Sequence, residues 1–167
     1  MWDKKSRFTG LVDAFSPDLY RYAYWLVGDQ HTAEDLVQET FTRAWRSLDS
    51  LRDERAAKAW LMTTLRRENA RRFARKSLAR SDIDVDTLES SINLDNGPEA
   101  RALGHALRGL SEDYRDPLLL QILGGFSVAE IAQEMNLTAG AVTTRLFRAR
   151  QKLRAVLTDE SDIKATK

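Results

Sequence analysis

One stretch of the sequence, residues 77–97, interrupts the helical pattern and divides the chain. It reads SLARSDIDVDTLESSINLDNG, is rich in Ser, Asp and Asn, and carries no apolar stripe at helical spacing. Helical signals dominate on both sides of it. The sequence therefore predicts an all-α protein of two small helical domains, residues 1–76 and 98–160, joined by an acidic flexible linker, residues 77–97, with the second domain a helix-turn-helix.

Composition excludes several kinds of protein. The 167 residues include no cysteine, which removes disulfides, zinc-finger sites and thiol nucleophiles and is compatible with a reducing cytoplasm. The two histidines, His31 and His105, lie far apart and have no ligand spacing around them. No apolar run approaches the roughly 20 residues that cross a bilayer, and the polar N-terminus has no signal-peptide core. We expect a cytoplasmic protein with no cofactor, no metal site and no direct membrane insertion.

The formal net charge of +1 hides a segregated pattern of charge. Residues 66–76 hold six bases and one acid, residues 81–99 hold six acids and no base, and residues 145–154 hold five bases and no acid. Each basic run alone is also compatible with a solvated helix face, and basic residues at a helix C-terminus gain from the helix dipole. Two basic elements around an acidic linker instead favour a nucleic acid contacted at two places.

In the first domain, local signals predict three helices. Ser16, Pro17 and Asp18 suit an N-cap and first turn, and that helix is expected to stop at Gly28. A second helix, beginning near Thr32, places its apolar residues on one side and a polar ridge on the other. A polar loop over residues 49–55 precedes a long helix that carries Trp60 and the first basic run.

In the second domain, the sequence predicts a helix-turn-helix over residues 127–157. Ser127 and Glu130 form a capping-box pattern before VAEIAQEM, and Thr138 is placed to cap the next helix. That last helix has an apolar stripe flanked by Arg145, Lys152 and Arg150. The side chains expected to point away from the stripe, toward a major groove, are Thr144, Phe147, Arg148 and Gln151.

Three segments of the chain resemble the sigma-70 factors of bacterial RNA polymerase. DLVQETFTRAW at residues 35–45, followed after a loop by AWL at residues 59–61, is similar to their core-polymerase-binding and promoter-melting domain. LSEDYRDPLLLQILGGFSVAEIAQEMNLTAGAVTTRLFRARQKLR at residues 110–154 looks like their C-terminal DNA-binding domain. With these two domains and a short linker, the chain resembles an extracytoplasmic-function (ECF) sigma factor over residues 19–157.

The resemblance implies roles for residues of the first domain. The polar ridge of the second helix would bind the clamp coiled coil of the largest polymerase subunit, through Asp35, Gln38, Glu39 and Thr42. The loop over residues 49–58 would take up a flipped base of the promoter −10 element, and the following basic helix would hold the DNA where its strands separate. The residues assigned to −10 recognition and melting are Asp49, Ser50, Arg52, Arg55, Lys58, Trp60, Arg66, Arg67, Arg71 and Arg75.

The resemblance also implies roles for the rest of the chain. The acidic linker would thread the polymerase cleft, where its acids mimic nucleic-acid charge. An anti-sigma factor is an expected partner beside core RNA polymerase and promoter DNA, although the sequence itself does not show it. The residues assigned to −35 DNA binding are Thr138, Thr143, Thr144, Arg145, Phe147, Arg148, Gln151 and Lys152.

The sequence departs from the family pattern at three positions. Arg67 and Arg71 stand where the pattern has an asparagine and an aspartate, so contacts made by those two residues are not carried over. Ala141 precedes Val142 and Thr143 where a threonine–valine pair followed by a basic residue is common. These departures predict a different way of stabilising melted DNA and a different −35 preference.

Three other classes of protein were weighed. An enzyme would need a convergent set of nucleophile, base or metal ligands, and the sequence offers none. An autonomous helix-turn-helix regulator would bind duplex DNA without polymerase, usually as a dimer on two half-sites. A protein-interaction adaptor would not need two basic elements.

Overall fold

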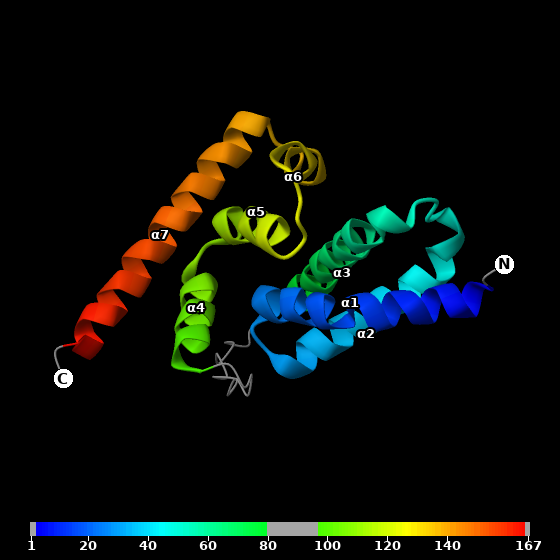
Figure 1. Ribbon diagram of the computed structural model, residues 1–167, viewed down its shortest axis with the longest axis horizontal. Helices are drawn as coiled ribbons and strands as arrows, with labels where there is room; N and C mark the ends of the chain where they lie inside the picture. The colour runs from blue at the N-terminus through cyan, green and yellow to red at the C-terminus, as the bar shows by residue number, and fades with distance from the viewer. Residues whose placement is uncertain (1–2, 80–96, 166–167) are drawn as a thin grey trace. The chain divides into compact units, whose positions relative to one another are not determined.

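The computed structural model describes residues 3–79 and 97–165, which form two compact units divided between Ser91 and Ile92 (Figure 1). Within the described residues the secondary structure consists of α-helices and short 3₁₀ turns, as an all-α fold requires. The acids expected in the linker, at residues 82–95, lie outside the described residues.

The first unit is built from helices α1 (Lys4–Val27), α2 (Gln30–Ser47) and α3 (Ala57–Ala79). Two 3₁₀ turns, η1 (Leu48–Ser50) and η2 (Glu54–Ala56), connect α2 to α3. The three helices pack against one another pairwise and enclose the core. Its fully buried side chains come from all three helices and include Leu19, Tyr22, Leu36, Leu61, Met62 and Leu65.

Helix α1 begins about thirteen residues earlier than the sequence predicted. Asp3, rather than Ser16, is the N-cap: its carboxylate accepts a hydrogen bond from the Ser6 amide at 2.6 Å, which lowers the pKa of Asp3. Pro17 lies inside the helix and on its exposed side. The carbonyl that its missing N–H would have bonded can therefore reach water, so apolar packing on the opposite side outweighs the local break signal.

The turn between α1 and α2 follows the prediction closely. Gly28 ends α1 at a φ of 73°, in the left-handed region where glycine is favoured, and its amide bonds the Tyr24 carbonyl at 2.8 Å. Asp29 then caps α2 by accepting from the Thr32 amide at 2.8 Å. Because Asp29 supplies this cap, α2 begins at Gln30, two residues before the predicted start.

The boundary predicted for the linker was three residues early. Helix α3 continues to Ala79, so residues 77–79 are helical rather than linker. The apolar stripe that guided the prediction ends earlier, since Ser77 and Leu78 are exposed. Helix formation propagates beyond the packed part of a helix at low cost.

The second unit contains α4 (Pro98–Gly109), α5 (Glu112–Ile122), α6 (Val128–Met135) and α7 (Ala139–Ala165). Helices α4, α5 and α6 all pack against α7, which forms the spine of the unit. Pro98 stands in the first turn of α4, as predicted. Helix α7 extends beyond the predicted domain end at residue 160. Its apolar stripe is buried from Val142 to Leu153, but Val156, farther along the helix, is exposed.

The described part of the chain contains no helix that is long and apolar enough to span a membrane.

Candidate functional site

The helix-turn-helix is present at the predicted residues. The Ser127 hydroxyl accepts from the Glu130 amide at 3.1 Å and the Glu130 carboxylate accepts from the Ser127 amide at 3.3 Å, which completes the capping box of α6. Asn136 adopts a left-handed conformation, with φ of 54°, and turns the chain into α7. Helices α6 and α7 thereby take the arrangement in which the second helix of such a motif is presented to DNA.

The outward face of α7 contains the four residues that the sequence placed there. Thr144, Phe147, Arg148 and Gln151 are all exposed, and the Phe147 side chain is 66% exposed. On the opposite face, Val142, Leu146 and Ala149 are buried. A large aromatic ring and a guanidinium exposed together on a helix surface contribute nothing to the core, so this face is available to a partner.

The basic residues at the flanks of α7 are held by α5. Arg145 lies 3.3 Å from a carboxylate oxygen of Asp113, the Lys152 ammonium lies 5.5 Å from the centre of the Tyr114 ring, and Arg150 donates to the Gln121 amide oxygen. Arg145 and Lys152, both predicted to contact the −35 element, thus already have partners within the unit. They hold α7 against α5, and only their remaining donors are open to a phosphate.

The two threonines at the start of α7 also have local partners. The Thr138 hydroxyl accepts from the Ala141 amide at 3.1 Å and caps the helix as predicted. The Thr143 hydroxyl donates to the Ala139 carbonyl at 3.0 Å.

The polar ridge of α2 is exposed where the sequence predicted it. Gln38, Glu39 and Thr42 are exposed, whereas Asp35 is half-buried. Asp35 lies 3.8 Å from a guanidinium nitrogen of Arg72, which also donates to a backbone carbonyl of α2. Asp35 therefore joins α2 to α3 in addition to standing in the ridge.

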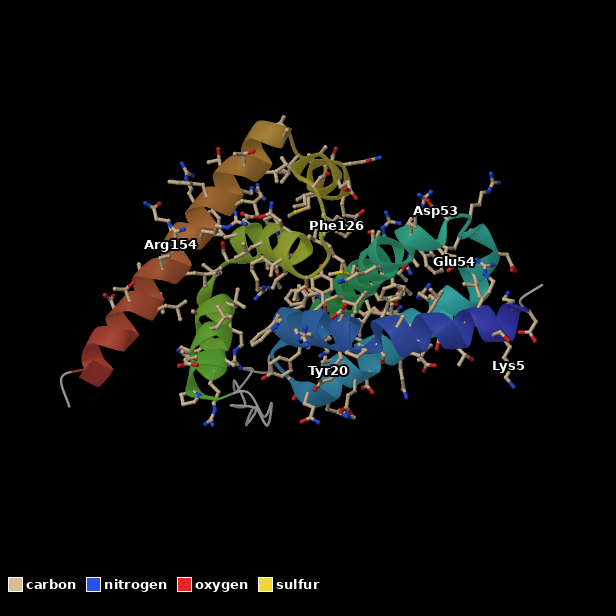
Figure 2. All side chains as sticks on the ribbon, viewed as in Figure 1. Lys5, Tyr20, Asp53, Glu54, Phe126 and Arg154 are labelled. Carbon is tan, nitrogen blue, oxygen red and sulfur yellow. The ribbon has the colours of Figure 1, made fainter. Side chains whose placement is uncertain are left out.

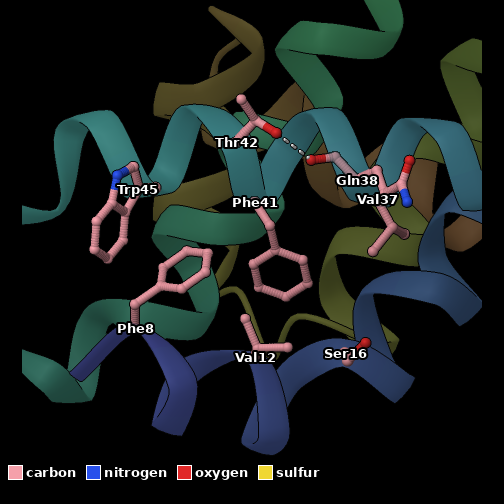
Figure 3. A pocket seen from close by; sticks show the side chains of 8 residues that line it. All are labelled: Phe8, Val12, Ser16, Val37, Gln38, Phe41, Thr42 and Trp45. Carbon is pink, nitrogen blue, oxygen red and sulfur yellow. Dashed lines mark hydrogen bonds between the residues drawn. The ribbon is translucent and has the colours of Figure 1, made fainter. Parts of the chain in front are cut away.

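An apolar groove lies beside this ridge, between α1 and α2 (Figure 3). It has a volume of about 530 Å³. Gln38 and Thr42 form part of its lining and so belong to both the ridge and the groove. Its other lining residues are Phe8, Val12, Ser16, Val37, Phe41 and Trp45. Sequence reasoning missed this groove because one of its walls comes from the early turns of α1, which were not predicted to be helical.

The connection between α2 and α3, residues 48–57, is an ordered loop on an apolar base. Leu48, Leu51 and Ala57 are buried with Leu11 of α1 in one cluster, against which Phe8, Phe15 and Trp60 pack. Trp60 thus packs against the apolar base of the loop. Arg52 and Arg55 are exposed on the loop, and the Ser50 hydroxyl donates to the Ser47 carbonyl at 2.6 Å.

Three ion pairs join the loop and its flanks to α1. The Lys4 ammonium lies 3.0 Å from Asp49, the Arg7 guanidinium lies 2.7 Å from Glu54, and the Lys58 ammonium lies 3.0 Å from Asp18. Figure 2 shows Asp53 and Glu54 on this connection. Asp49 and Lys58, predicted to contact DNA, are therefore engaged in holding the loop. Lys4, Arg7 and Asp18 were missed because nothing local in the sequence relates them to residues 40 or more positions away.

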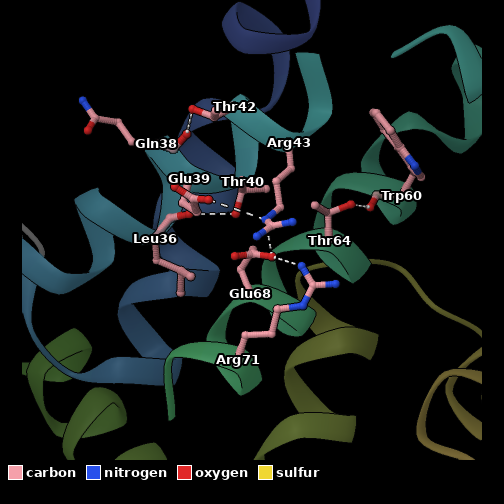
Figure 4. Close-up of polar contacts among 10 residues, drawn as sticks. All are labelled: Leu36, Gln38, Glu39, Thr40, Thr42, Arg43, Trp60, Thr64, Glu68 and Arg71. Atoms are coloured by element: carbon pink, nitrogen blue, oxygen red, sulfur yellow. Dashed lines mark hydrogen bonds and ion pairs between the residues drawn. The ribbon is translucent and has the colours of Figure 1, made fainter. Parts of the chain in front are cut away.

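The basic run of α3 is anchored by a buried acid. Glu68 is 2% exposed, and one of its carboxylate oxygens accepts from Arg71 at 2.6 Å and pairs with Arg43 of α2 (Figure 4). Arg43 in turn lies 3.5 Å from Glu39 of the ridge. A line of alternating charges, from Glu39 through Arg43 and Glu68 to Arg71, therefore connects the polar ridge of α2 with the basic helix α3.

The other members of the basic run differ in exposure. Arg67 and Arg75 are exposed, and Arg66 is half-buried. With Arg71 held by Glu68 and Arg72 held by Asp35, the exposed positive charge of α3 is reduced but not removed. Two acidic residues of the first unit, Glu68 and Asp35, thus neutralise part of the positive charge of the basic run. Among the described residues, no cluster of His, Cys, Asp and Glu side chains is arranged to hold a metal ion.

Comparison with known proteins agrees with this two-unit arrangement. Residues 11–79 match the family model of sigma-70 region 2, and residues 100–153 match that of sigma-70 region 4. The fold and the two matches define a factor of the sigma-70 class.

Individual relatives narrow the class. The ECF RNA polymerase sigma factor SigL of Mycobacterium tuberculosis is 35% identical over 88% of this chain and 86% of its own length. The ECF sigma factor BldN of Streptomyces coelicolor is 34% identical over 92% of this chain, which spans 61% of BldN. Among solved structures, the sigma factor RpoE of Bartonella quintana, in complex with the anti-sigma factor NepR, has a TM-score of 0.72 at 28% identity, covering 91% of this chain and 97% of that one. The chain belongs to the ECF sigma factors.

Proposed function

We propose that this protein binds core RNA polymerase and directs promoter-specific transcription initiation by recognising −35 and −10 elements and melting the −10 element. The observation that carries the proposal is the order of two helical units, one matching sigma-70 region 2 and the next matching region 4, each with an exposed basic helix. The first unit would bind polymerase and melt DNA, the second would read the −35 element, and residues 80–96 would connect them.

The α2 ridge with its groove is the proposed polymerase site. Gln38, Glu39 and Thr42 supply exposed polar groups beside an apolar hollow. Interfaces that combine an apolar centre with a polar rim are those in which a few side chains carry most of the binding energy. Asp35, half-buried and paired with Arg72, would add a carboxylate at the edge of the ridge nearest α3.

The loop and α3 form the proposed −10 site. Arg52 and Arg55 on the loop, and Arg67, Arg71 and Arg75 on α3, supply exposed guanidinium groups that bind phosphates without reading sequence. Extracting a base from the stack costs a few kcal/mol, so a loop that captures it must be ordered in advance. The proposed site also includes Trp60, which packs under the loop, and the polar residues around it, Asp49, Ser50, Lys58 and Arg66.

The outward face of α7 is the proposed −35 site. Arg148 and Gln151 are the residue types that make paired hydrogen bonds to guanine and adenine, each worth about 1–3 kcal/mol of discrimination. Phe147 and Thr144 offer apolar contacts to a thymine methyl group. The flanks of this face would contact DNA phosphates through Thr138, Thr143, Arg145 and Lys152.

Further roles follow from the same proposal. The protein supplies recognition and melting while polymerase supplies the chemistry, so it is not an enzyme and acts in the cytoplasm. An anti-sigma factor is a proposed partner, since the similar RpoE structure is a complex with the anti-sigma factor NepR.

Run-off transcription tests the proposal. The purified chain is added to sigma-free bacterial core polymerase with a library of genomic promoters, and transcript starts are sequenced. Specific starts that share a −35/−10 pattern are expected, and Arg148→Ala should weaken them while Lys5→Ala, an exposed charge of α1, should not. Tight duplex binding by the chain alone, with no specific transcripts, would contradict the proposal and favour an autonomous regulator.

A further inference from the structure

Arg7 lies outside the residues that match the region 2 family model, yet its side chain donates three hydrogen bonds to the 48–57 loop. Its Nε and Nη2 atoms both donate to one carboxylate oxygen of Glu54, at 2.9 and 2.7 Å. Nη2 also donates to the Leu51 carbonyl, at 3.0 Å. One guanidinium thus joins the middle of the loop to the start of its second 3₁₀ turn.

The position of Leu51 makes this contact consequential. Leu51 is buried in the apolar cluster beneath the loop, so its backbone is fixed by packing on one side and by Arg7 on the other. Residues 52 and 53, between Leu51 and Glu54, are exposed. Fixing both ends of this dipeptide limits the conformations that it samples.

Lys4 supports the same arrangement one turn earlier on α1. Its ammonium pairs with Asp49 at 3.0 Å and lies 5.2 Å from the centre of the Trp45 ring. The first two turns of α1 therefore contact the loop at residues 49, 51 and 54. A solvated helix end would leave these basic side chains directed at water, with no regular relation to one segment.

We propose that Arg7 is a positioning residue, which holds the 48–57 loop in the conformation that captures a base of the −10 element. The inference rests on the proposed function, because the loop must first contact promoter DNA. Arg7 itself need not touch DNA; it acts through Leu51 and Glu54. Binding to a pre-ordered loop avoids the entropy of ordering it at the moment of capture.

The contacts predict the relative effects of substitutions. The Glu54 side chain is 58% exposed, so its ion pair is screened by water and contributes little alone. The bond to the Leu51 carbonyl is charge-assisted and part-buried, and it accounts for most of the effect. Arg7→Ala should therefore impair the loop more than Glu54→Gln does.

The test measures discrimination at the −10 element with the full chain and core polymerase. Run-off transcription is compared between a cognate promoter and templates with single −10 substitutions, for the wild type, Arg7→Ala, Arg7→Lys and Glu54→Gln. Arg7→Ala should lower the cognate-to-substituted ratio about three- to tenfold, and Arg7→Lys, which keeps the charge but not the forked geometry, should lie between it and the wild type. Lys5→Ala, which removes a neighbouring exposed charge, is the matched control.

The outcomes separate the inference from the proposed function. If the wild type gives no specific transcripts, the sigma-factor proposal itself fails. If the wild type is specific but Arg7→Ala lowers transcription equally on all templates, or leaves the ratio unchanged, the positioning role is wrong. If circular dichroism shows that Arg7→Ala folds less completely, the test uses Arg7→Lys with an unchanged spectrum instead. A lower cognate-to-substituted transcription ratio for Arg7→Lys then supports the positioning role, and an unchanged ratio contradicts it.

Discussion

The buried carboxylate of Glu68 gives the sharpest prediction for the stability of the first unit. Removing both of its partners, in Arg43→Met/Arg71→Met, leaves a carboxylate that is 2% exposed without the two guanidinium groups that neutralise it. Stranding one member of a buried ionic network costs about 3–5 kcal/mol. A unit of roughly 80 residues has only about 4–12 kcal/mol of stability, so this loss is a large fraction of it.

Each single variant should cost less than half of what the double variant costs. With one arginine removed, the other still pairs with Glu68, so the single loss should be at most about 1.5 kcal/mol, the low end for a hydrogen bond to a charged group. Arg43 and Arg71 are 35% and 51% exposed, so water weakens the ion pair that each makes with Glu68. Losing either pair alone therefore costs less stability. The double variant is therefore expected to exceed the sum of the singles by about 1 kcal/mol or more.

Adding Glu68→Leu to the double variant should then recover most of the lost stability. The triple variant has no charge left to strand, and replacing a whole buried ionic group by apolar side chains is often neutral or stabilising. If the two methionines had instead only disturbed packing, adding Glu68→Leu would not restore stability.

Urea unfolding of the full chain, followed by tryptophan fluorescence, measures these differences. All four tryptophans precede residue 61, so the signal reports the first unit. The reasoning is refuted if the double variant equals the sum of the singles, or if Glu68→Leu destabilises the double variant further.

Three other predictions concern the helix ends and the outward face of α7. Ser127→Ala removes the capping box of α6 and should cost about 1 kcal/mol in urea unfolding followed by far-ultraviolet circular dichroism, whereas Ser127→Asp should retain most of it. Phe147→Ala should change stability by less than about 0.5 kcal/mol, because the ring is exposed, yet weaken binding of the holoenzyme to −35 duplex DNA in fluorescence anisotropy; unchanged binding would remove Phe147 from the site. The hydrogen bond from the Ser6 amide lowers the pKa of Asp3 in the folded protein. The ionised cap therefore stabilises the first turn of α1 at pH values above the unfolded pKa of Asp3, and this stabilisation is lost as pH falls through the lower folded pKa. The NMR chemical shift of the Ser6 amide should follow this titration in the wild type and not in Asp3→Asn.

The sequence alone determined the features that depend on a few neighbouring residues. Gly28 ends α1 because its backbone takes a left-handed conformation, and Ser127 with Glu130 begins α6 because each satisfies the amide of the other. The stripe from Val142 to Leu153 and the opposite face with Phe147 and Arg148 follow from helical periodicity. These signals were enough for the fold class, the two units and the outward face of the last helix.

Only the tertiary structure decided which charged side chains remain available to partners. Glu68 looked like one acid in an exposed basic run, but Arg43, 25 positions earlier in the chain, makes its burial possible. The sequence placed Arg145 and Lys152 at the flank of the apolar stripe, but only the structure shows that Asp113 and Tyr114 of α5 are their partners. Periodicity gives the direction of a side chain on its own helix, whereas its ionic partner is set by the helix packed against it.

The start of α1 shows the same division most clearly. Ser16 and Pro17 are a local signal for the start of a helix, and that signal was outweighed because apolar residues on both sides of Pro17 are buried. That continuation places Lys4 and Arg7 against a loop more than 40 residues away. No local pattern encodes that contact, since it exists only when three helices have packed together.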